Sequence, residues 1–97
     1  MRKFELLPNV ELPKPARSTK KAAGYDIRSN QNVVIQPGTK EVVHTGVTVI
    51  CNDDEFLDLR IRSGLAFRND LTLQNDAGVI DADYYPKEIM VMIRNEG

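Results

Sequence analysis

The chain has 97 residues, a length that allows one small domain. Its 13 lysine and arginine residues against 14 aspartate and glutamate residues give a net charge of -1, so nothing in the overall charge favours binding to nucleic acid or to a membrane surface. The single cysteine, Cys51, excludes a disulfide within the chain, and no apolar run approaches the roughly 20 residues that span a bilayer. The sequence therefore predicts one domain over residues 1–97 in a reducing, cytoplasmic compartment.

Short apolar runs separated by turn residues follow one another through the first half of the chain. Pro37 and Gly38 suit the two central positions of a type II turn, because proline presets φ and glycine accepts a positive φ. The strands predicted here cover residues 4–7, 22–27, 33–35, 40–44 and 47–51.

The clearest strand pattern spans residues 57–62, where Leu57, Leu59 and Ile61 alternate with charged residues. A period of two places the apolar side chains on one face and the charges on the other. Shorter runs predict strands at residues 71–73 and 78–80, and the unbroken apolar run 89–93 predicts a strand covered on both faces. Turn signals about 8–12 residues apart are typical of sandwiches and barrels.

One segment favours a helical turn within this all-β pattern. Ser63 is a suitable N-cap before residues 65–68, and Asn69-Asp70 is expected to end the helix after about one turn.

Arg62, Ser63 and Gly64 stand where a predicted strand gives way to that helical turn. An arginine fork, a serine hydroxyl and an unobstructed glycine N–H can all bind phosphate oxygens. The alternative is a capped turn with an exposed arginine, and these three residues alone favour that alternative.

Two further segments carry carboxylates beside turn residues. Asp81 and Asp83 precede Tyr84 after an apolar run; a carboxylate can orient or deprotonate a water, and an aromatic ring can cover a sugar or base. The alternative there is a polar hairpin tip. Asp26, beside Gly24, can hold a Mg²⁺-bound water, because Mg²⁺ keeps several waters and takes few protein ligands. Taken alone, Asp26 is better interpreted as a turn residue. His44 has no histidine or cysteine at metal-ligand spacing.

Three segments together, in chain order, resemble the sequence motifs of the homotrimeric dUTP diphosphatases (dUTPases). They are Ala-Gly-Tyr-Asp-Ile at residues 23–27, Arg-Ser-Gly-Leu-Ala at 62–66 and Ala-Gly-Val-Ile-Asp-Ala-Asp-Tyr at 77–84. Leu12-Pro13 and Thr45-Gly46-Val47 also resemble that family. The resemblance covers nearly the whole chain and implies a jelly-roll-like β-barrel. It also implies a homotrimer with active sites at subunit boundaries.

The resemblance further implies hydrolysis of dUTP to dUMP and pyrophosphate, by attack of water on the α-phosphorus with Mg²⁺ on the triphosphate. Asp26 would hold the Mg²⁺ through water, and Arg62, Ser63 and Gly64 would bind phosphates. Asp81 would bind the 3′-hydroxyl and orient the attacking water. The nucleoside contacts implied are Asn75, Gly78, Val79, Ile80 and Tyr84. For Tyr84 the alternative is a residue of the barrel wall whose hydroxyl finds a partner.

Three departures from the family pattern alter these expectations. Tyr85-Pro86-Lys87 replaces an Arg-Gly pair and is one residue longer, so we expect a reshaped hairpin loop. Ile61 replaces a proline common before the second motif. After residue 97 there is no counterpart of the family's fourth motif or of its glycine-rich arm, so we expect a C-terminally incomplete domain that alone hydrolyses little dUTP and exposes strand edges.

Two alternative functions remain on the sequence alone. One is a truncated, non-catalytic homologue that acts as a binding or regulatory module. The other is a relative of dCTP deaminase, a family whose second motif usually has Arg-Ser-Ser and which lacks a pair such as Asp83-Tyr84.

Overall fold

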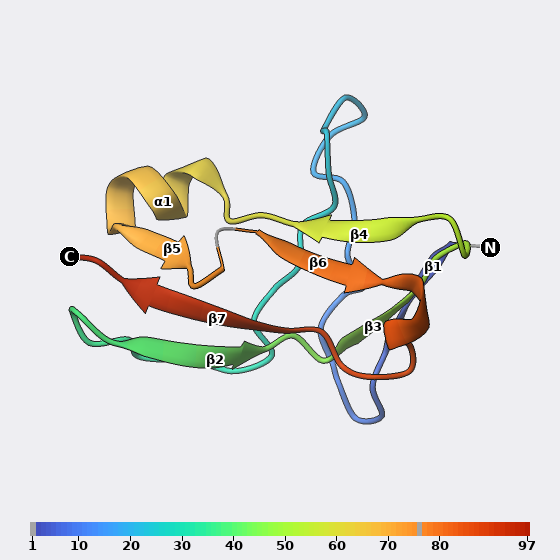
Figure 1. The fold of residues 1–97 in the computed structure, drawn as a ribbon, viewed down its shortest axis with the longest axis horizontal. Coiled ribbons are helices and arrows are strands. Elements are labelled where there is room, and N and C mark those ends of the chain that lie inside the picture. The colour runs from blue at the N-terminus through green and yellow to red at the C-terminus, as the bar shows by residue number, and fades with distance from the viewer. Residues whose placement is uncertain (1, 76) are drawn as a thin grey trace.

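The computed structural model describes residues 2–75 and 77–97 (Figure 1). The strands all pair antiparallel in three small sheets, with orders β1-β3, β2-β7-β5 and β4-β6. The elements in chain order are β1 (Lys3–Leu6), β2 (Lys40–His44), β3 (Val47–Ile50), β4 (Phe56–Leu59), α1 (Ser63–Asn69), β5 (Leu71–Leu73), β6 (Gly78–Asp81), the short 3-10 helix η1 (Ala82–Tyr84) and β7 (Met90–Asn95).

The predicted all-β class with one short helix is confirmed, whereas closure into a barrel is not found among the described strands. Closure needs every strand to have two hydrogen-bonded neighbours. Here only β7 has two, and every other described strand leaves one edge unpaired. The architecture is therefore an open, jelly-roll-like arrangement of sheets.

The alternating pattern predicted for residues 57–62 is confirmed on β4 for residues 57–59, but the strand ends at Leu59, three residues earlier than predicted. Leu57 and Leu59 are half-buried, and Asp58 and Arg60 between and beside them are exposed. Leu57 lies opposite Ile80 of β6, which is in the core. This pairing places β4 and β6 with their apolar sides toward the same interior.

Two of the predicted strands, at residues 22–27 and 33–35, are wrong. Asp26 forms only an isolated bridge, in which its N–H donates to the Ala16 carbonyl at 2.9 Å. The carbonyl of Ile35 accepts a hydrogen bond from the side-chain amide of Asn95 at 2.8 Å. An apolar run forms a strand only where a neighbouring strand offers a ladder, and neither segment finds one here.

Helix α1 is longer than predicted, and its N-cap lies one residue earlier in the sequence than expected. Arg62, in extended conformation, is the N-cap and makes no side-chain cap hydrogen bond, so the predicted Ser63 cap is wrong. The predicted end is correct, because Asp70 takes a left-handed conformation and its N–H donates to the Leu65 carbonyl. No residue of α1 is buried, and the Phe67 side chain is 84% exposed.

The core joins β3, β6 and the residue before β7. Its buried members are Val47, Val49, Ile80 and Ile89, and Ile89 has no exposed surface. The prediction that residues 89–93 are covered on both faces is wrong at Met90, which is 46% exposed. Within the described residues no helix is long and apolar enough to cross a membrane.

The corner between β2 and β3 is fixed by buried polar contacts. Thr45 is buried, and its hydroxyl donates to the Ile89 carbonyl at 2.7 Å. Gly46 has φ +69°, and a Cβ added there would lie 2.9 Å from Val10 Cγ2, so only glycine fits without a shift. At the other turn, Gly38 has φ +79° and the Thr39 N–H donates to the Gln36 carbonyl, as expected of a type II turn.

Candidate functional site

A cavity of about 910 Å³ lies between the loop at residues 22–27, strand β4 and the start of α1. Asp26 from the loop lines it together with Arg62, Ser63 and Gly64. The predicted magnesium-holding residue and the predicted phosphate-binding residues therefore come together in one molecule, although 36 or more positions separate them in sequence.

The backbone places each of these groups for contact with a ligand. Arg62 leaves the sheet in extended conformation and is exposed, so its guanidinium is free of the core. An added Cβ at Gly64 would meet no atom within 4 Å, so the backbone there is open to close approach. Asp26 is half-buried and is fixed by its backbone bridge to Ala16. These groups can bind several phosphate oxygens at once.

The donor set fits a magnesium ion that keeps most of its waters. Among residues 2–75 and 77–97 no group of three or more histidine, cysteine, aspartate or glutamate side chains can hold a metal ion. Asp26 lines the cavity that also holds Arg62, and Asp58 of β4 is the other carboxylate in its lining. One carboxylate, waters and substrate phosphates make up a common Mg²⁺ ligand set.

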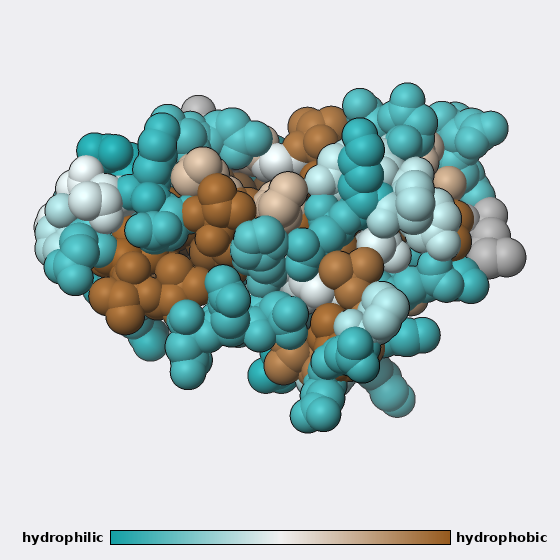
Figure 2. Space-filling view, turned by 90° about the horizontal axis from the view of Figure 1, so that it is seen from below, coloured by the Kyte–Doolittle hydropathy of each residue, from teal (hydrophilic) through white to brown (hydrophobic). Residues whose placement is uncertain are grey.

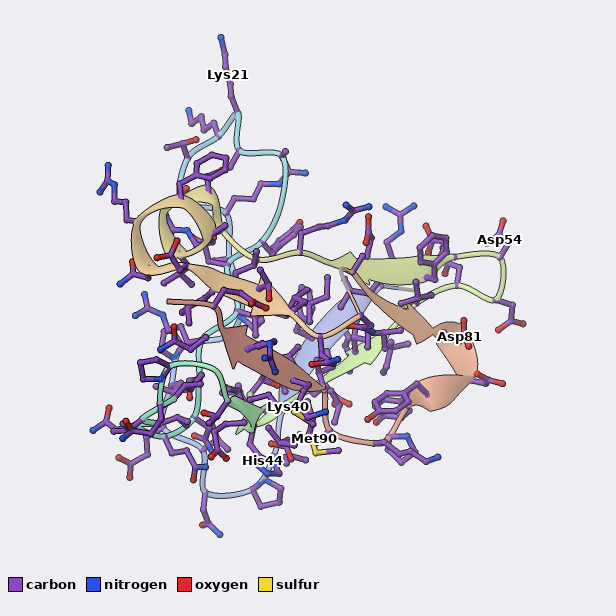
Figure 3. All side chains as sticks on the ribbon, turned by 60° about the vertical axis from the view of Figure 1, so that its left-hand side comes forward. Lys21, Lys40, His44, Asp54, Asp81 and Met90 are labelled. Atoms are coloured by element: carbon purple, nitrogen blue, oxygen red, sulfur yellow. The ribbon has the colours of Figure 1, made fainter. Side chains whose placement is uncertain are left out.

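Asp81 lies elsewhere in the same molecule. It is exposed at the end of β6, opposite Phe56, and lines a separate depression of about 580 Å³. Figure 3 shows Asp81 on the same side of the molecule as Asp54, which also lines that depression. The predicted water-orienting carboxylate and the predicted phosphate-binding residues thus line different cavities of one chain.

Tyr84, on η1, is held by the fold itself. Its ring packs against the core cluster and its hydroxyl donates to the Glu88 carbonyl at 2.6 Å. The Lys87 ammonium lies 5.8 Å from the ring centroid. This environment matches the alternative of a wall residue with a satisfied hydroxyl, and the contact with a sugar stays a prediction.

The remaining nucleoside-contact candidates lie along and before β6. Asn75 is exposed in the turn after β5, and the Val79 side chain is 59% exposed. Ile80 instead points into the core, so only its backbone is available. An added Cβ at Gly78 would lie 3.2 Å from Leu59 Cβ. Among the described strands β6 pairs only with β4, which leaves the backbone groups of its other edge free for a base.

Contacts between distant residues, which local patterns did not predict, shift the pKa of carboxyl groups near these cavities. The Arg2 guanidinium, bonded to Glu55, holds the pKa of that carboxyl below its ordinary value, and the Asn52 N–H adds to this. The Tyr85 hydroxyl donates to Glu5 at 2.6 Å, which lowers the pKa of Glu5 and raises the pKa of Tyr85. No local sequence pattern links Arg2 to Glu55 or Glu5 to Tyr85, since the members of each pair lie far apart in the sequence.

We expect Tyr85→Phe to raise the pKa of Glu5 toward its ordinary value, because the hydroxyl is the largest cause of the shift. A carboxyl with a lowered folded pKa adds stability above its unfolded pKa and loses it as pH falls through the folded one. Following the Glu5 side chain by NMR during an acid titration measures this. Tyr25→Phe is the control, and an unchanged Glu5 titration in Tyr85→Phe would contradict the contact.

Comparisons with known proteins agree on one family. The dUTPase family model matches residues 10–97. The deoxyuridine 5′-triphosphate nucleotidohydrolase of Nautilia profundicola is 40% identical over 87 residues, covering 90% of this chain and 61% of the relative. The chain thus spans about 60% of the length of the curated relatives it matches.

Solved structures show the same likeness. The crystal structure of dUTPase from Streptococcus mutans superposes with a TM-score of 0.90 at 34% identity, covering 97% of this chain and 79% of that chain. A mutant dUTPase from phage phi11 of S. aureus, described with a structural Mg(II) ion, gives a TM-score of 0.85 at 32% identity, over 100% of this chain and 61% of that one. The predicted jelly-roll-like fold class is therefore confirmed.

Proposed function

The chain belongs to the dUTPase family, and from this we propose that the protein hydrolyses dUTP to dUMP and pyrophosphate by attack of water on the α-phosphorus. The observation that carries the proposal is the shared cavity of Asp26 and residues 62–64. Phosphoryl transfer depends mainly on positioning and on charge stabilisation, and this cavity offers groups for both.

In the proposed reaction Arg62, Ser63 and Gly64 bind the triphosphate oxygens and fix the α-phosphorus. Asp26 holds Mg²⁺ through a water, and the ion, when bound, offsets the charge of the phosphate oxygens. Asp81 accepts a hydrogen bond from the attacking water and aims it along the line of displacement. Asn75, Gly78 and the backbone of residues 79–80 contact the uracil.

We propose that the complete site forms between copies in a homotrimer. Asp81 and Arg62 line different cavities of one chain, so a partner copy that supplies the second set would bring them together. The underside of the molecule, bordered by β2, shows hydrophobic patches among hydrophilic residues (Figure 2). Val42 of β2 and Met90 of β7 are exposed large hydrophobic residues, as expected of a surface that a second copy covers.

The test is an activity assay of the protein that the gene naturally produces, after its mass has been measured. The assay is done first in a cytoplasmic extract and then on the purified protein. Incubation with dUTP and Mg²⁺ is expected to give dUMP and pyrophosphate in equal amounts. Tight dUTP binding without pyrophosphate release would instead favour a binding or regulatory module. Release of ammonia from dCTP would favour a deaminase.

Tyr84→Ala separates the two interpretations of that residue. If the ring lies against C2′ of the sugar, the variant is expected to narrow the gap between dUTP and UTP in kcat/KM, because a steric barrier to the 2′-hydroxyl is gone. If Tyr84 only supports the core, the variant loses roughly 3–5 kcal/mol of stability with selectivity unchanged. Both nucleotides and the Tm are measured on one protein, with Tyr85→Ala as the control; unchanged selectivity with a collapsed Tm would rule out the sugar contact.

A further inference from the structure

The segment from Tyr84 to Glu88 is tied to the β2–β3 corner through one residue. Glu88 Oε2 accepts the Gly46 N–H at 2.8 Å, and Glu88 Oε1 lies 2.9 Å from His44 Nδ1. Its main-chain carbonyl accepts the Tyr84 hydroxyl at 2.6 Å. Glu88 therefore contacts both the β2–β3 corner and the connection at residues 81–88, which links β6 to β7.

Burial and crowding restrict the conformation of the corner to which Glu88 is bonded. Thr45 and Gly46 are buried, and the positive φ of Gly46 and its crowding by Val10 fix the direction of its N–H. The backbone continues the attachment, since the Ile89 N–H donates to the Val47 carbonyl at 2.8 Å. A connection that is bonded to this corner is therefore held in a fixed position.

The connection at residues 81–88 has few other side-chain hydrogen bonds. Asp81, Asp83 and Tyr85 are exposed, and the described side-chain hydrogen bonds of residues 81–87 are those of Tyr84 to Glu88 and of Tyr85 to Glu5. The Glu88 side chain is 20% exposed, whereas the Glu5 side chain is 36% exposed. Glu88 is thus the better shielded of the two attachments.

We propose that Glu88 is a positioning residue, which holds η1 against the Thr45-Gly46 corner and so sets the position of Tyr84. Glu88 touches no reacting atom and acts through the position of η1. The inference rests on the proposed function for its consequence in catalysis. The hydrogen bonds that carry it are independent of any nucleotide.

The chemistry of the residue explains why a carboxylate suits this position. Two donors, one backbone and one imidazole, approach its two oxygens separately. An ionised carboxylate only accepts, so Nδ1 is the ring nitrogen of His44 that carries the hydrogen. Glutamine keeps one carbonyl acceptor for the Gly46 N–H, whereas alanine removes both acceptors. The pair of variants therefore separates partial from complete loss of the attachment.

Amide hydrogen exchange of the protein without nucleotide tests the attachment. In Glu88→Ala we expect exchange of residues 81–88 to accelerate about tenfold or more, with α1 and β5 unchanged, because a charged hydrogen-bond partner is lost only there. Glu88→Gln should be close to the wild type. Glu96→Ala is the matched control, since Glu96 bonds Arg94 near the other end of β7. Uniform acceleration, or none beyond that of Glu96→Ala, would overturn the inference.

Kinetics of the same variants test the consequence. In Glu88→Ala we expect the preference for dUTP over UTP to fall about tenfold in kcat/KM, because a displaced Tyr84 ring no longer fits the sugar. A merely structural role would lower the Tm and leave this preference unchanged, and that result would overturn the positioning role. Should Glu88→Ala not fold, His44→Ala removes one donor and is expected to show the same pattern more weakly; its absence counts equally against the inference. A wild-type protein that does not turn over dUTP contradicts the proposed function alone. The exchange measurement still decides whether Glu88 holds the connection at residues 81–88.

Discussion

Asp81→Asn is expected to lower kcat for dUTP by about 10²–10⁴-fold, the usual effect of removing a positioned general base. Asparagine keeps the size of the side chain and loses the negative oxygen that would orient the water. The side chain is exposed at the end of β6, so the substitution leaves no buried group unpaired. Binding of dUTP should therefore persist, and single-turnover kinetics with a binding titration would separate the two effects.

Asp83→Asn is the control for Asp81, because Asp83 lines the same depression and is also exposed. The control should retain most of its turnover. A near-normal kcat in Asp81→Asn would assign the carboxylate role to another residue, and a large loss in Asp83→Asn would identify Asp83 as that residue.

Ile89→Ala is expected to lower the free energy of unfolding by about 2–5 kcal/mol, since a large aliphatic side chain is removed from a packed site. Ile89 has no exposed surface and packs with Val47 and Ile80. Its backbone bonds to Val47 and Thr45 do not involve the side chain, so the loss reports packing alone. Chemical denaturation followed by circular dichroism measures the difference.

Met90→Ala is the matched control for Ile89, because it is the next residue and is 46% exposed. Its effect should stay within about 1 kcal/mol, as for most exposed positions. Equal losses in the two variants would contradict the placement of the core at the start of β7.

Much of the fold followed from local pattern. The run at residues 40–44 has the same bounds as β2, and the alternation after residue 57 identifies the exposed and interior sides of β4. The turn at Pro37-Gly38 and the end of α1 at Asp70 were equally predictable, because glycine and aspartate tolerate a positive φ.

The wrong strand predictions have a common physical cause. Residues 22–27 and 33–35 are apolar enough for strands, but a strand is a pairing and its partner lies elsewhere in the chain. The same cause hid the contacts of Glu88, whose donors are 42 and 44 positions away. The prediction of a closed barrel was wrong for the same reason, because closure requires a partner for every strand edge and local patterns do not specify those partners.

The members of the candidate site stay predictions, and the structure tests only how they are placed relative to one another. Sequence motifs pointed to Asp26 and Arg62, and the structure brings these two to one cavity. That Asp81 lies in another cavity of the same chain is set by the pairing of β4 with β6, which carries it away from α1. No motif contains that information.

The position of β7 in its sheet bears on how the chain can fold during synthesis. β7 is the last strand of these residues, yet β2 and β5 both pair with it and not with each other (Figure 1). A nascent chain that has left the ribosome up to β6 can form the two-stranded β1–β3 and β4–β6 sheets but cannot begin this third sheet. Such late, non-local pairing is slow, and it leaves β2 without its partner strand until β7 emerges. We therefore expect charged Lys40 and Glu41 at the start of β2 to protect the growing polypeptide from aggregation until β7 emerges.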